Sequence, residues 1–255
     1  MGYELIETTV ECGQYHVDLA NPDKPNPIND QLQDELGRVL DDVEADPDAS
    51  VLTIASAGTH FAVGADIARM NEWFQNDEWD ELISFFRAGQ ELMARIDDLE
   101  VVTIAGINGY ALGGGLELGL ACDIRIAGES ATVGFPEVDL GMIPGWGGTQ
   151  RLPRVVGEST AKELLVTGRH VEADEAFELG IVDRVVGEDD LRDELAEYRE
   201  TLAEKPDHIL PYLLDAVETG AESPMETGLS YELFCNTFAS FDEETSVLIE
   251  EFANR

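Results

Sequence analysis

The chain has 255 residues, of which 44% are hydrophobic, so it can build the core of one good-sized domain, and a disordered chain is excluded. Fifty-four acidic residues face fifteen basic ones, and the formal net charge of −39 disfavours nucleic-acid binding, which requires a basic surface. Only three of the basic residues are lysines, and the acids are spread along the chain. This pattern favours adaptation to a very salty cytoplasm, where salt screens repulsion among the acids; an acidic surface for a basic partner is the alternative.

Other features of the sequence indicate a cytoplasmic protein without membrane segments or metal sites. The opening residues MGYELIETTV contain neither the basic nor the apolar part of a signal peptide. The longest apolar run, residues 101–116, is interrupted by Asn108 and is too short to span a bilayer. Cys12, Cys122 and Cys235 are odd in number and far apart, which is typical of a reducing compartment and does not match a metal-binding motif.

The predicted elements alternate between strands and helices over most of the chain. Two β-rich runs, residues 3–9 and 14–20, flank Cys12-Gly13 and predict a hairpin. A loop rich in proline and asparagine follows at residues 21–30, and apolar residues then keep helical spacing from Leu32 to Val43. The segments expected farther along are a buried strand at 51–56, a long helix around 82–96, buried strands at 101–106 and 122–128, helical material from the turn at 141–150 to residue 167, a strand-like run at 180–186 and helices from 191 onward.

This order of elements predicts an α/β protein. Strand, loop and helix alternate up to about residue 190, and helices follow. We therefore expect an α/β core at residues 1–190 and a C-terminal helical region at residues 191–255.

The segment NGYALGGGLELGLACD, residues 108–123, combines three consecutive glycines with one carboxylate among leucines. If the strand at 101–106 leads into a helix from Leu116, the glycines lie at the junction, where a helix N-terminus exposes unpaired N–H groups. Glu117 would then lie on the same helical face as Gly114. We interpret the segment as a donor for a developing oxyanion with a carboxylate beside it; a tight turn with close helix packing is the alternative.

Two other segments could supply partners for this site. In FPEVDLGMIPGWGGTQ, residues 135–150, Glu137 follows Pro136 and precedes another glycine-rich turn. Paired carboxylates can divide acid and base work when their surroundings push their pKa values apart. The loop HFAVGADI, residues 60–67, could supply a second backbone donor, and two donors on one oxygen suit a carbonyl that becomes an enolate. We interpret His60 in this loop as structural.

Five motifs, in their order along the chain, resemble those of the enoyl-CoA hydratase/isomerase (crotonase) family. They are THFAVGADIARM, NGYALGGGLEL, ACDIRIAG, FPEVDLGMIPGWGGTQRLPRVVG and LVTGR…A…LGIVDRVV, and they extend over nearly the whole chain. The resemblance implies a spiral of ββα units, C-terminal helices used in trimer assembly, and acyl-CoA substrates. The assembly that it implies is a homotrimer or a dimer of trimers.

The resemblance also implies roles for individual residues. It places the N–H groups of an oxyanion hole on Ala65 and Gly114, and two catalytic acids on Glu117 and Glu137. Gly145 matches a glycine whose N–H helps to hold the second acid or the water. The residues matched to substrate binding are Ala65, Asp66, Ile67, Ala68, Gly114, Gly145, Trp146, Pro27 and Ile28, of which Pro27, Ile28 and the 65–68 segment would line the adenine end of CoA. No metal is implied, and no cofactor beyond the CoA of the substrate.

Because it has both acids, the chain is most similar to the hydratases of the family. The expected reaction is syn addition of water to a trans-2-enoyl-CoA, which gives a 3-hydroxyacyl-CoA in the degradation of fatty acids or related acyl-CoA esters. A 3,2-enoyl-CoA isomerase that uses chiefly Glu137 is one alternative. A non-catalytic acyl-CoA-binding protein is another.

Three positions depart from the family pattern. Ala68, followed by Arg69, stands where a lysine often reaches the CoA phosphate. The end of the chain has only Arg255 in place of a lysine-rich segment. Both changes fit the general depletion of lysine. Trp146 occupies a position that is often small, where it could shorten or reshape the acyl pocket, or pack under the helix.

Overall fold

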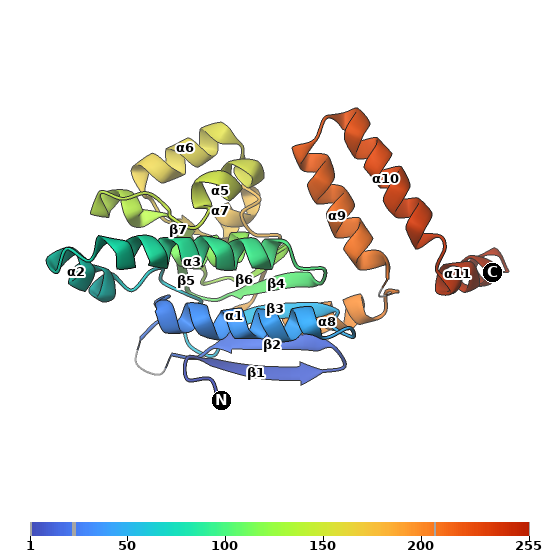
Figure 1. Cartoon of the computed structure of the whole chain (residues 1–255), viewed down its shortest axis with the longest axis horizontal. Coiled ribbons are helices and arrows are strands. Elements are labelled where there is room, and N and C mark those ends of the chain that lie inside the picture. The colour runs from blue at the N-terminus through green and yellow to red at the C-terminus, as the bar shows by residue number, and fades with distance from the viewer. Residues whose placement is uncertain (1, 22–23, 207, 255) are drawn as a thin grey trace.

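The computed structural model describes residues 2–21, 24–206 and 208–254, and its helices surround a central sheet (Figure 1). Arg255 lies outside the described residues. The six-stranded sheet has the order β1-β2-β3-β4-β6-β9, in which β1 and β2 are antiparallel and the other neighbours are parallel. Its strands are β1 Ile6–Glu11, β2 Gln14–Leu19, β3 Val51–Ser56, β4 Val102–Ile107, β6 Ile124–Gly128 and β9 Arg184–Val186.

Burial on both faces explains the sequence of the central strands. Every residue of β3 and β4 is buried, so the sequences of these strands are nearly continuous apolar runs and do not alternate between apolar and polar residues. One face of the sheet belongs to the main core, and the other packs against Leu191 and Leu195 of α8, Leu191–Ala203. The edge strand β1 buries only Ile6.

A second, three-stranded sheet and the remaining helices complete the fold. The small sheet has the order β5-β7-β8, with β5 Tyr110–Leu112, β7 Thr132–Gly134 and β8 Val171–Glu172. The helices before α8 are α1 Asp30–Ala45, α2 Ile67–Gln75, α3 Trp79–Asp97, α4 Gly114–Leu120, α5 Gly148–Val156, α6 Glu158–Thr167 and α7 Ala173–Glu178, with short 3-10 helices at η1 Pro136–Leu140 and η2 Glu188–Asp190.

The chain winds as a spiral that passes from the large sheet through a second layer to a helix. β4 leads to β5 and α4, and β6 leads to β7, η1 and α5. After β3, Ala62 forms an isolated bridge with Ala111 of β5, so the loop after β3 occupies the same layer. Because β5 also pairs with β7, three segments that are far apart in sequence lie side by side. The predicted ββα spiral is confirmed.

Some local expectations are confirmed and others change. The hairpin is confirmed, since Glu11 pairs with Gln14 across the turn. The glycine segment does not follow β4 directly, because β5 intervenes. Helix α2 was not expected; it begins after Asp66, whose side chain accepts hydrogen bonds from the N–H groups of Ala68 and Arg69, which have no partner within the helix. The strand expected at 180–186 is shorter, because the N–H of Ile181 bonds the preceding helix instead of a neighbouring strand.

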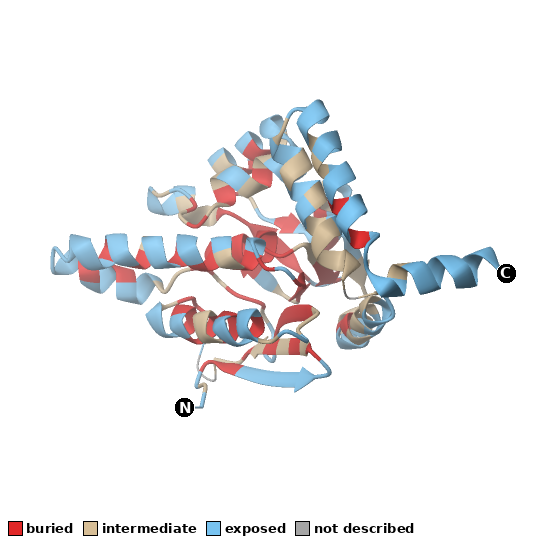
Figure 2. Ribbon diagram, turned by 45° about the vertical axis from the view of Figure 1, so that its right-hand side comes forward, coloured by how far each residue is buried: buried red, intermediate tan, exposed pale blue. Residues whose placement is uncertain are grey.

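The last helices lie beside the core and beyond it. α9 Ile209–Glu222 and α10 Met225–Ala239 lie side by side, and α11 Glu243–Ala253 projects from the body, where Figure 2 shows it exposed along nearly its whole length. Within the described residues, no helix combines the length and the apolar character needed to cross a membrane. Helix α8 packs on the sheet, and Leu210 and Leu214 of α9 pack against the same cluster, whereas α10 and α11 are largely exposed, so the division at residue 190 stays a prediction.

Candidate active site

The glycine segment forms the start of α4, where close packing excludes side chains. Gly113 is the N-cap residue and has φ 52°, and Gly114 and Gly115 begin the helix. A Cβ on Gly113 would lie 2.7 Å from Oε1 of Glu137, and a Cβ on Gly115 would clash with the carbonyl of Ala62. The glycines therefore allow a loop and a carboxyl group to approach the N-terminus of the helix together.

The loop after β3 is tied to the strand that precedes α4. The carbonyl of Ala62 accepts a hydrogen bond from the N–H of Leu112 at 3.0 Å, and its N–H donates to the carbonyl of Tyr110 at 3.1 Å. A Cβ on Gly64, whose φ is 85°, would lie 3.3 Å from the nitrogen of Gly114. The loop therefore meets the first residue of α4.

Two main-chain N–H groups remain available at this meeting point. Ile28 donates to the carbonyl of Gly64 at 2.7 Å and accepts from the N–H of Asp66 at 3.0 Å, a pairing that leaves the N–H of Ala65 unused. Gly114 is the first residue of α4, so its N–H has no partner within the helix. Among the described residues neither N–H has a main-chain acceptor, and both residues line one cavity.

Glu117 is a buried acid whose carboxylate is fixed by main-chain donors. Its exposed fraction is 2%, and its Oε1 accepts hydrogen bonds from the N–H groups of Trp146 and Gly148, both at 2.7 Å. Burial raises the pKa of Glu117 above its usual value, although these N–H groups and the charge of Arg151 act in the opposite direction. The carboxylate is therefore held in one place, one helical turn from the N-terminus of α4.

The turn before α5 is itself held from both sides. Gln90 on α3 donates a hydrogen bond to the carbonyl of Gly145 at 2.8 Å, and Nη1 of Arg151 donates to the carbonyl of Trp146 at 3.2 Å. The N–H of Gly145 also favours the ionised form of Glu117. The family resemblance implied that this N–H holds the second acid, Glu137, or the water, whereas in the structure it acts on Glu117.

Glu137 is the second acid, and it lies on η1 with its carboxyl group next to Gly113. Its Oε2 is buried without a hydrogen-bond partner among the described residues. Burial and, to a smaller extent, the charge of Glu117 raise the pKa of Glu137 to about 7. The charge of Glu117 thus contributes to the protonation of Glu137, and the two acids are electrostatically coupled.

A cavity of about 160 Å³ contains the groups that were expected to do chemistry. The predicted site residues in its lining are Ala65, Ile67, Gly114, Glu117, Glu137, Gly145 and Trp146. The rest of the lining is largely apolar and includes Val63, Met70, Phe86, Leu140, Met142 and Ile143. The fold thus collects the two N–H donors and the two acids from three turns of the spiral into one space.

Four residues that were predicted to bind substrate lie outside this cavity. Asp66 caps α2 and forms an ion pair with Lys24 at 2.9 Å, and Ala68 is exposed on the first turn of that helix. Pro27 and Ile28 are buried, the exposed fraction of Ile28 is 0%, and its main-chain N–H and carbonyl are bonded to Gly64 and Asp66. The substrate-binding roles of these four residues stay predictions.

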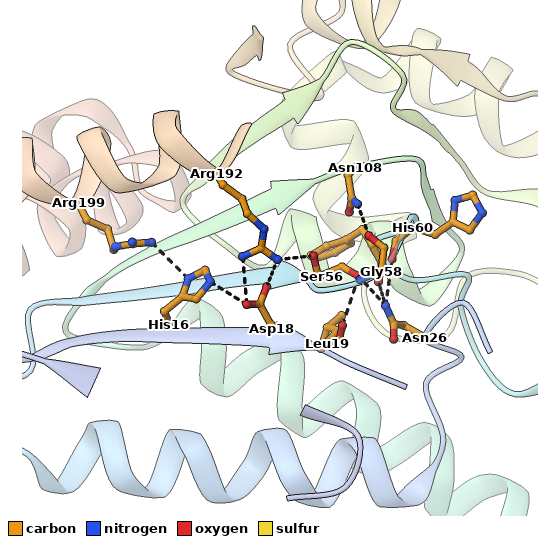
Figure 3. Close-up of polar contacts among 11 residues, drawn as sticks. His16, Asp18, Leu19, Asn26, Ser56, Gly58, His60, Asn108, Arg192 and Arg199 are labelled. Carbon is orange, nitrogen blue, oxygen red and sulfur yellow. Dashed lines mark hydrogen bonds and ion pairs between the residues drawn. The ribbon is translucent and has the colours of Figure 1, made fainter. Parts of the chain in front are cut away.

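Asn26 was not identified from the sequence, although it holds the loop that carries Ala65 (Figure 3). Its side-chain nitrogen lies 2.9 Å from Oγ of Ser56, 3.0 Å from the carbonyl oxygen of His60 and 2.9 Å from that of Phe61, and donates to them. Asn26 is buried with φ 49°, a conformation that asparagine tolerates better than most residues. The asparagine-rich loop was visible in the sequence, but the acceptors that Asn26 reaches come from segments brought near by the fold.

His60 and Asn108 brace the same region (Figure 3). Nδ1 of His60 accepts a hydrogen bond from the N–H of Tyr110 at 3.1 Å, and the two rings stack with centroids 4.7 Å apart. The side chain of Asn108 donates to the carbonyl of Gly58 at 2.7 Å. These contacts support the structural interpretation of His60.

The arrangement suits acid–base chemistry next to a carbonyl group. Two N–H donors can bind one carbonyl oxygen and stabilise the negative charge that develops on it. Two carboxyl groups at the same cavity, one ionised and one protonated, can take a proton from one atom and give a proton to another. A carbonyl compound that passes through an enolate is therefore the substrate type that fits these groups.

The raised pKa of Glu137 predicts a cost to stability that depends on pH. The pKa in the folded state, about 7, exceeds the usual 4.5, so the folded state binds this proton more tightly and stability falls as pH rises from about 4.5 to 7. Replacement Glu137→Gln should therefore raise the free energy of unfolding by about 1–2 kcal/mol at pH 8, after discounting for partial exposure, and by much less at pH 5.

Urea unfolding of both proteins at pH 5 and pH 8, at constant salt, measures this difference. Asp139→Asn is the matched control, because Asp139 is an exposed acid on the same 3-10 helix and should show no such change between the two pH values. An equal effect of Glu137→Gln at both pH values would contradict the prediction.

Comparison with known protein families places this site in context. The family model described as enoyl-CoA hydratase/isomerase matches residues 11–251. A probable enoyl-CoA hydratase of Mycobacterium bovis is 37% identical over 245 residues, covering 95% of this chain and 93% of the relative. A crotonyl-CoA hydratase of Syntrophomonas wolfei is 38% identical over 247 residues, covering 96% and 94%.

Solved structures show the same similarity in three dimensions. The enoyl-CoA hydratase from Bacillus anthracis superimposes with a TM-score of 0.92 at 32% sequence identity, covering 98% of this chain and 96% of the other. The enoyl-CoA hydratase from Thermoplasma volcanium superimposes with a TM-score of 0.88 at 29% identity, covering 97% and 96%. The similarity therefore includes the spiral core and the C-terminal helices.

Proposed function

The chain belongs to the enoyl-CoA hydratase/isomerase family, and we propose that it is an enoyl-CoA hydratase that adds water syn to a trans-2-enoyl-CoA, giving a 3-hydroxyacyl-CoA. The observation that carries the proposal is the presence of both Glu117 and Glu137 at one cavity with the N–H groups of Ala65 and Gly114. The reaction would serve the degradation of fatty acids or related acyl-CoA esters. It uses no cofactor beyond the CoA of the substrate.

In the proposed mechanism the thioester oxygen accepts hydrogen bonds from the N–H groups of Ala65 and Gly114. Electron density then moves from the double bond toward this oxygen, so C3 becomes open to attack by water. A main-chain donor that is aimed at a developing oxyanion contributes ~3 kcal/mol of transition-state stabilisation. The positive end of the α4 dipole acts on the same oxygen.

The two acids would divide the proton transfers. Glu117, whose ionised form is favoured by the N–H groups of Trp146 and Gly148, orients the water and takes its proton as the oxygen bonds to C3. Glu137, whose pKa near 7 leaves it partly protonated at neutral pH, gives its proton to C2. The reverse reaction exchanges these roles, so the active state in both directions is the pair that carries one proton.

Replacing either acid tests this mechanism. Glu117→Gln and Glu137→Gln should each lower kcat for hydration of crotonyl-CoA by on the order of 10²- to 10⁴-fold, since each removes one proton-transfer step. The loss of enoyl-thioester absorbance measures the rate. Glu129→Gln, which changes an exposed acid of a surface turn, is the control and should keep full activity. Wild-type activity in the Glu117, Glu137 double variant would contradict the proposal.

The same assay separates the hydratase from its two alternatives. A 3,2-enoyl-CoA isomerase would use Glu137 without needing Glu117, and it would convert a 3-enoyl-CoA far faster than it hydrates a 2-enoyl-CoA. A non-catalytic binding protein would bind CoA esters tightly and turn over none. The hydratase is favoured because the N–H groups of Trp146, in the turn before α5, and of Gly148, at the start of α5, hold Glu117 at the cavity.

The acidic surface supports the proposal that the enzyme works in a salty cytoplasm. The acidic groups behind the net charge of −39 repel one another at low ionic strength, and dissolved salt screens this repulsion. Activity and thermal stability should therefore both rise as potassium chloride is increased from dilute to near-saturating concentration. Inactivation by concentrated salt, measured in the hydration assay, would contradict this proposal.

The apolar surface of the last helices supports assembly into a homotrimer or a dimer of trimers. Its exposed residues are Leu213, Val217, Met225, Leu229, Leu233, Phe234, Phe238, Phe241, Val247, Leu248, Ile249 and Phe252. Among them, the rings of Phe234, Phe238 and Phe241 contact one another in sequence, and a large exposed apolar patch is typical of an interface, because exposing apolar surface to water is unfavourable.

Sedimentation measurements test the assembly. The wild-type protein should have the mass of three or six chains, and Phe241→Asp combined with Phe252→Asp should give smaller species, because both side chains are more than 70% exposed in the single chain. Val10→Asp, at an exposed apolar position on β1, is the control and should keep the wild-type mass. A monomeric wild-type protein would contradict the proposal.

A further inference from the structure

Trp146 is wedged between two helices at positions where neither helix has a side chain. Its exposed fraction is 2%. A Cβ on Gly114 of α4 would clash with the six-membered ring of the indole, and a Cβ on Gly89 of α3 would clash with Nε1 and its neighbours. The indole also packs edge-to-face on Phe85 of α3, with ring centroids 5.3 Å apart. The indole therefore lies between α3 and α4 and contacts both helices.

The exposure of the lining residues indicates that the cavity has an exposed rim and a closed end, with Trp146 at the closed end. Ile67, Leu140 and Ile143 line the cavity with exposed fractions of 50%, 57% and 72%, so they mark the side open to solvent. Trp146 and Met70 line it with exposed fractions of 2%. A charged group as large as CoA can enter only past the exposed rim, so the acyl chain points toward the closed end.

The proposed chemistry sets the direction of the chain beyond C3. The water that attacks C3 is held by Glu117, and Oε1 of Glu117 is bonded to the N–H of Trp146. The carbon atoms beyond C3 therefore lie next to the turn that carries the indole. A cavity of about 150 Å³ holds a molecule the size of benzene, and the cavity here measures about 160 Å³. The space available therefore suits a short acyl chain.

We propose that Trp146 closes the acyl pocket and restricts the enzyme to short-chain 2-enoyl thioesters of roughly four to six carbon atoms. This inference rests on the proposed function and names its substrate class. The carrying observation is that a buried indole, fitted against two glycines, lines the cavity at which both acids lie.

The surroundings of Trp146 explain why a longer chain cannot extend past it. Trp146 also borders a second cavity of about 730 Å³ between the core and α9. The charged residues in the lining of this second cavity are Asp97, Asp98, Arg151, Arg154, Asp215, Glu218 and Glu222. An acyl chain that displaced the indole would enter this charged space. Its burial there would contribute no favourable hydrophobic free energy, because the surroundings are not apolar. Trp146 thus separates an apolar pocket from a charged one.

A chain-length series tests the proposal. For the wild-type enzyme, kcat/KM should fall at least about 100-fold from crotonyl-CoA to trans-2-octenoyl-CoA, because methylenes that do not fit a rigid pocket cost about 10-fold or more. Trp146→Leu should raise the ratio of octenoyl to crotonyl turnover at least about 10-fold, with Trp146→Phe in between. The ratio does not depend on how much of a variant is folded, so loss of stability does not obscure the result.

Trp73→Leu is the matched control. Trp73 is also 2% exposed and also packs on Phe85, with centroids 5.2 Å apart, but it does not line the cavity. Its replacement should leave the chain-length ratio unchanged. A similar rise in the ratio for Trp73→Leu would overturn the assignment to Trp146, since general loosening of α3 would then explain it.

Binding measurements separate this proposal from the proposed function. Calorimetry with butyryl-, hexanoyl- and octanoyl-CoA should show tight binding of the shorter esters by the wild-type protein, and tighter binding of octanoyl-CoA by Trp146→Leu. That binding result would support the role of Trp146 whether or not the protein hydrates enoyl-CoA. Absence of hydration would refute only the proposal that the protein is a hydratase. Equal turnover and equal binding of all chain lengths by the wild-type protein would overturn the role of Trp146.

Discussion

The hydrogen bonds from Trp146 in the turn before α5 and from Gly148 at the start of α5 to Oε1 of Glu117 are the contact on which the rest of the site depends. A carboxylate with 2% exposure would be costly to bury without donors, and two N–H groups at 2.7 Å supply them. The same bonds join α4 to the segment that leads into α5. Gly114 lies in one of the joined segments and Trp146 in the other. The same bonds therefore position the N–H of Gly114 and the indole of Trp146 relative to each other.

The site combines two acids in different surroundings. Glu117 is held by main-chain donors, whereas Oε2 of Glu137 is buried without a partner among the described residues. Burial raises both pKa values, and the charge of Glu117 adds to the effect on Glu137. Because its ionisation is unfavourable, Glu137 still carries a proton near neutral pH, and it can donate this proton there. Function and stability make opposite demands on this residue.

Much of the fold could be predicted from the sequence because local signals were strong. The buried strands β3 and β4 are continuous apolar runs, and the hairpin turn at Cys12-Gly13 lies where both residues adopt positive φ. Helix α2 and strand β5 were missed. Helix α2 depends on the cap that Asp66 provides, and the three residues of β5 become a strand only because β7 pairs with them. Short elements of this kind carry little periodicity, so tertiary contacts decide them.

The sequence by itself determined the chemical components: the glycines that admit a close backbone, the acids at 117 and 137, and the lysine-poor acidic surface. These are properties of residue type and spacing, which survive without coordinates. Only the tertiary structure decided which N–H groups hold Glu117, how far burial shifts the pKa of Glu137, that Asn26 anchors the loop of Ala65, and that the indole of Trp146 forms a wall. Each of these depends on the distance between segments that the spiral brings together, and distance through space is not encoded in any one segment.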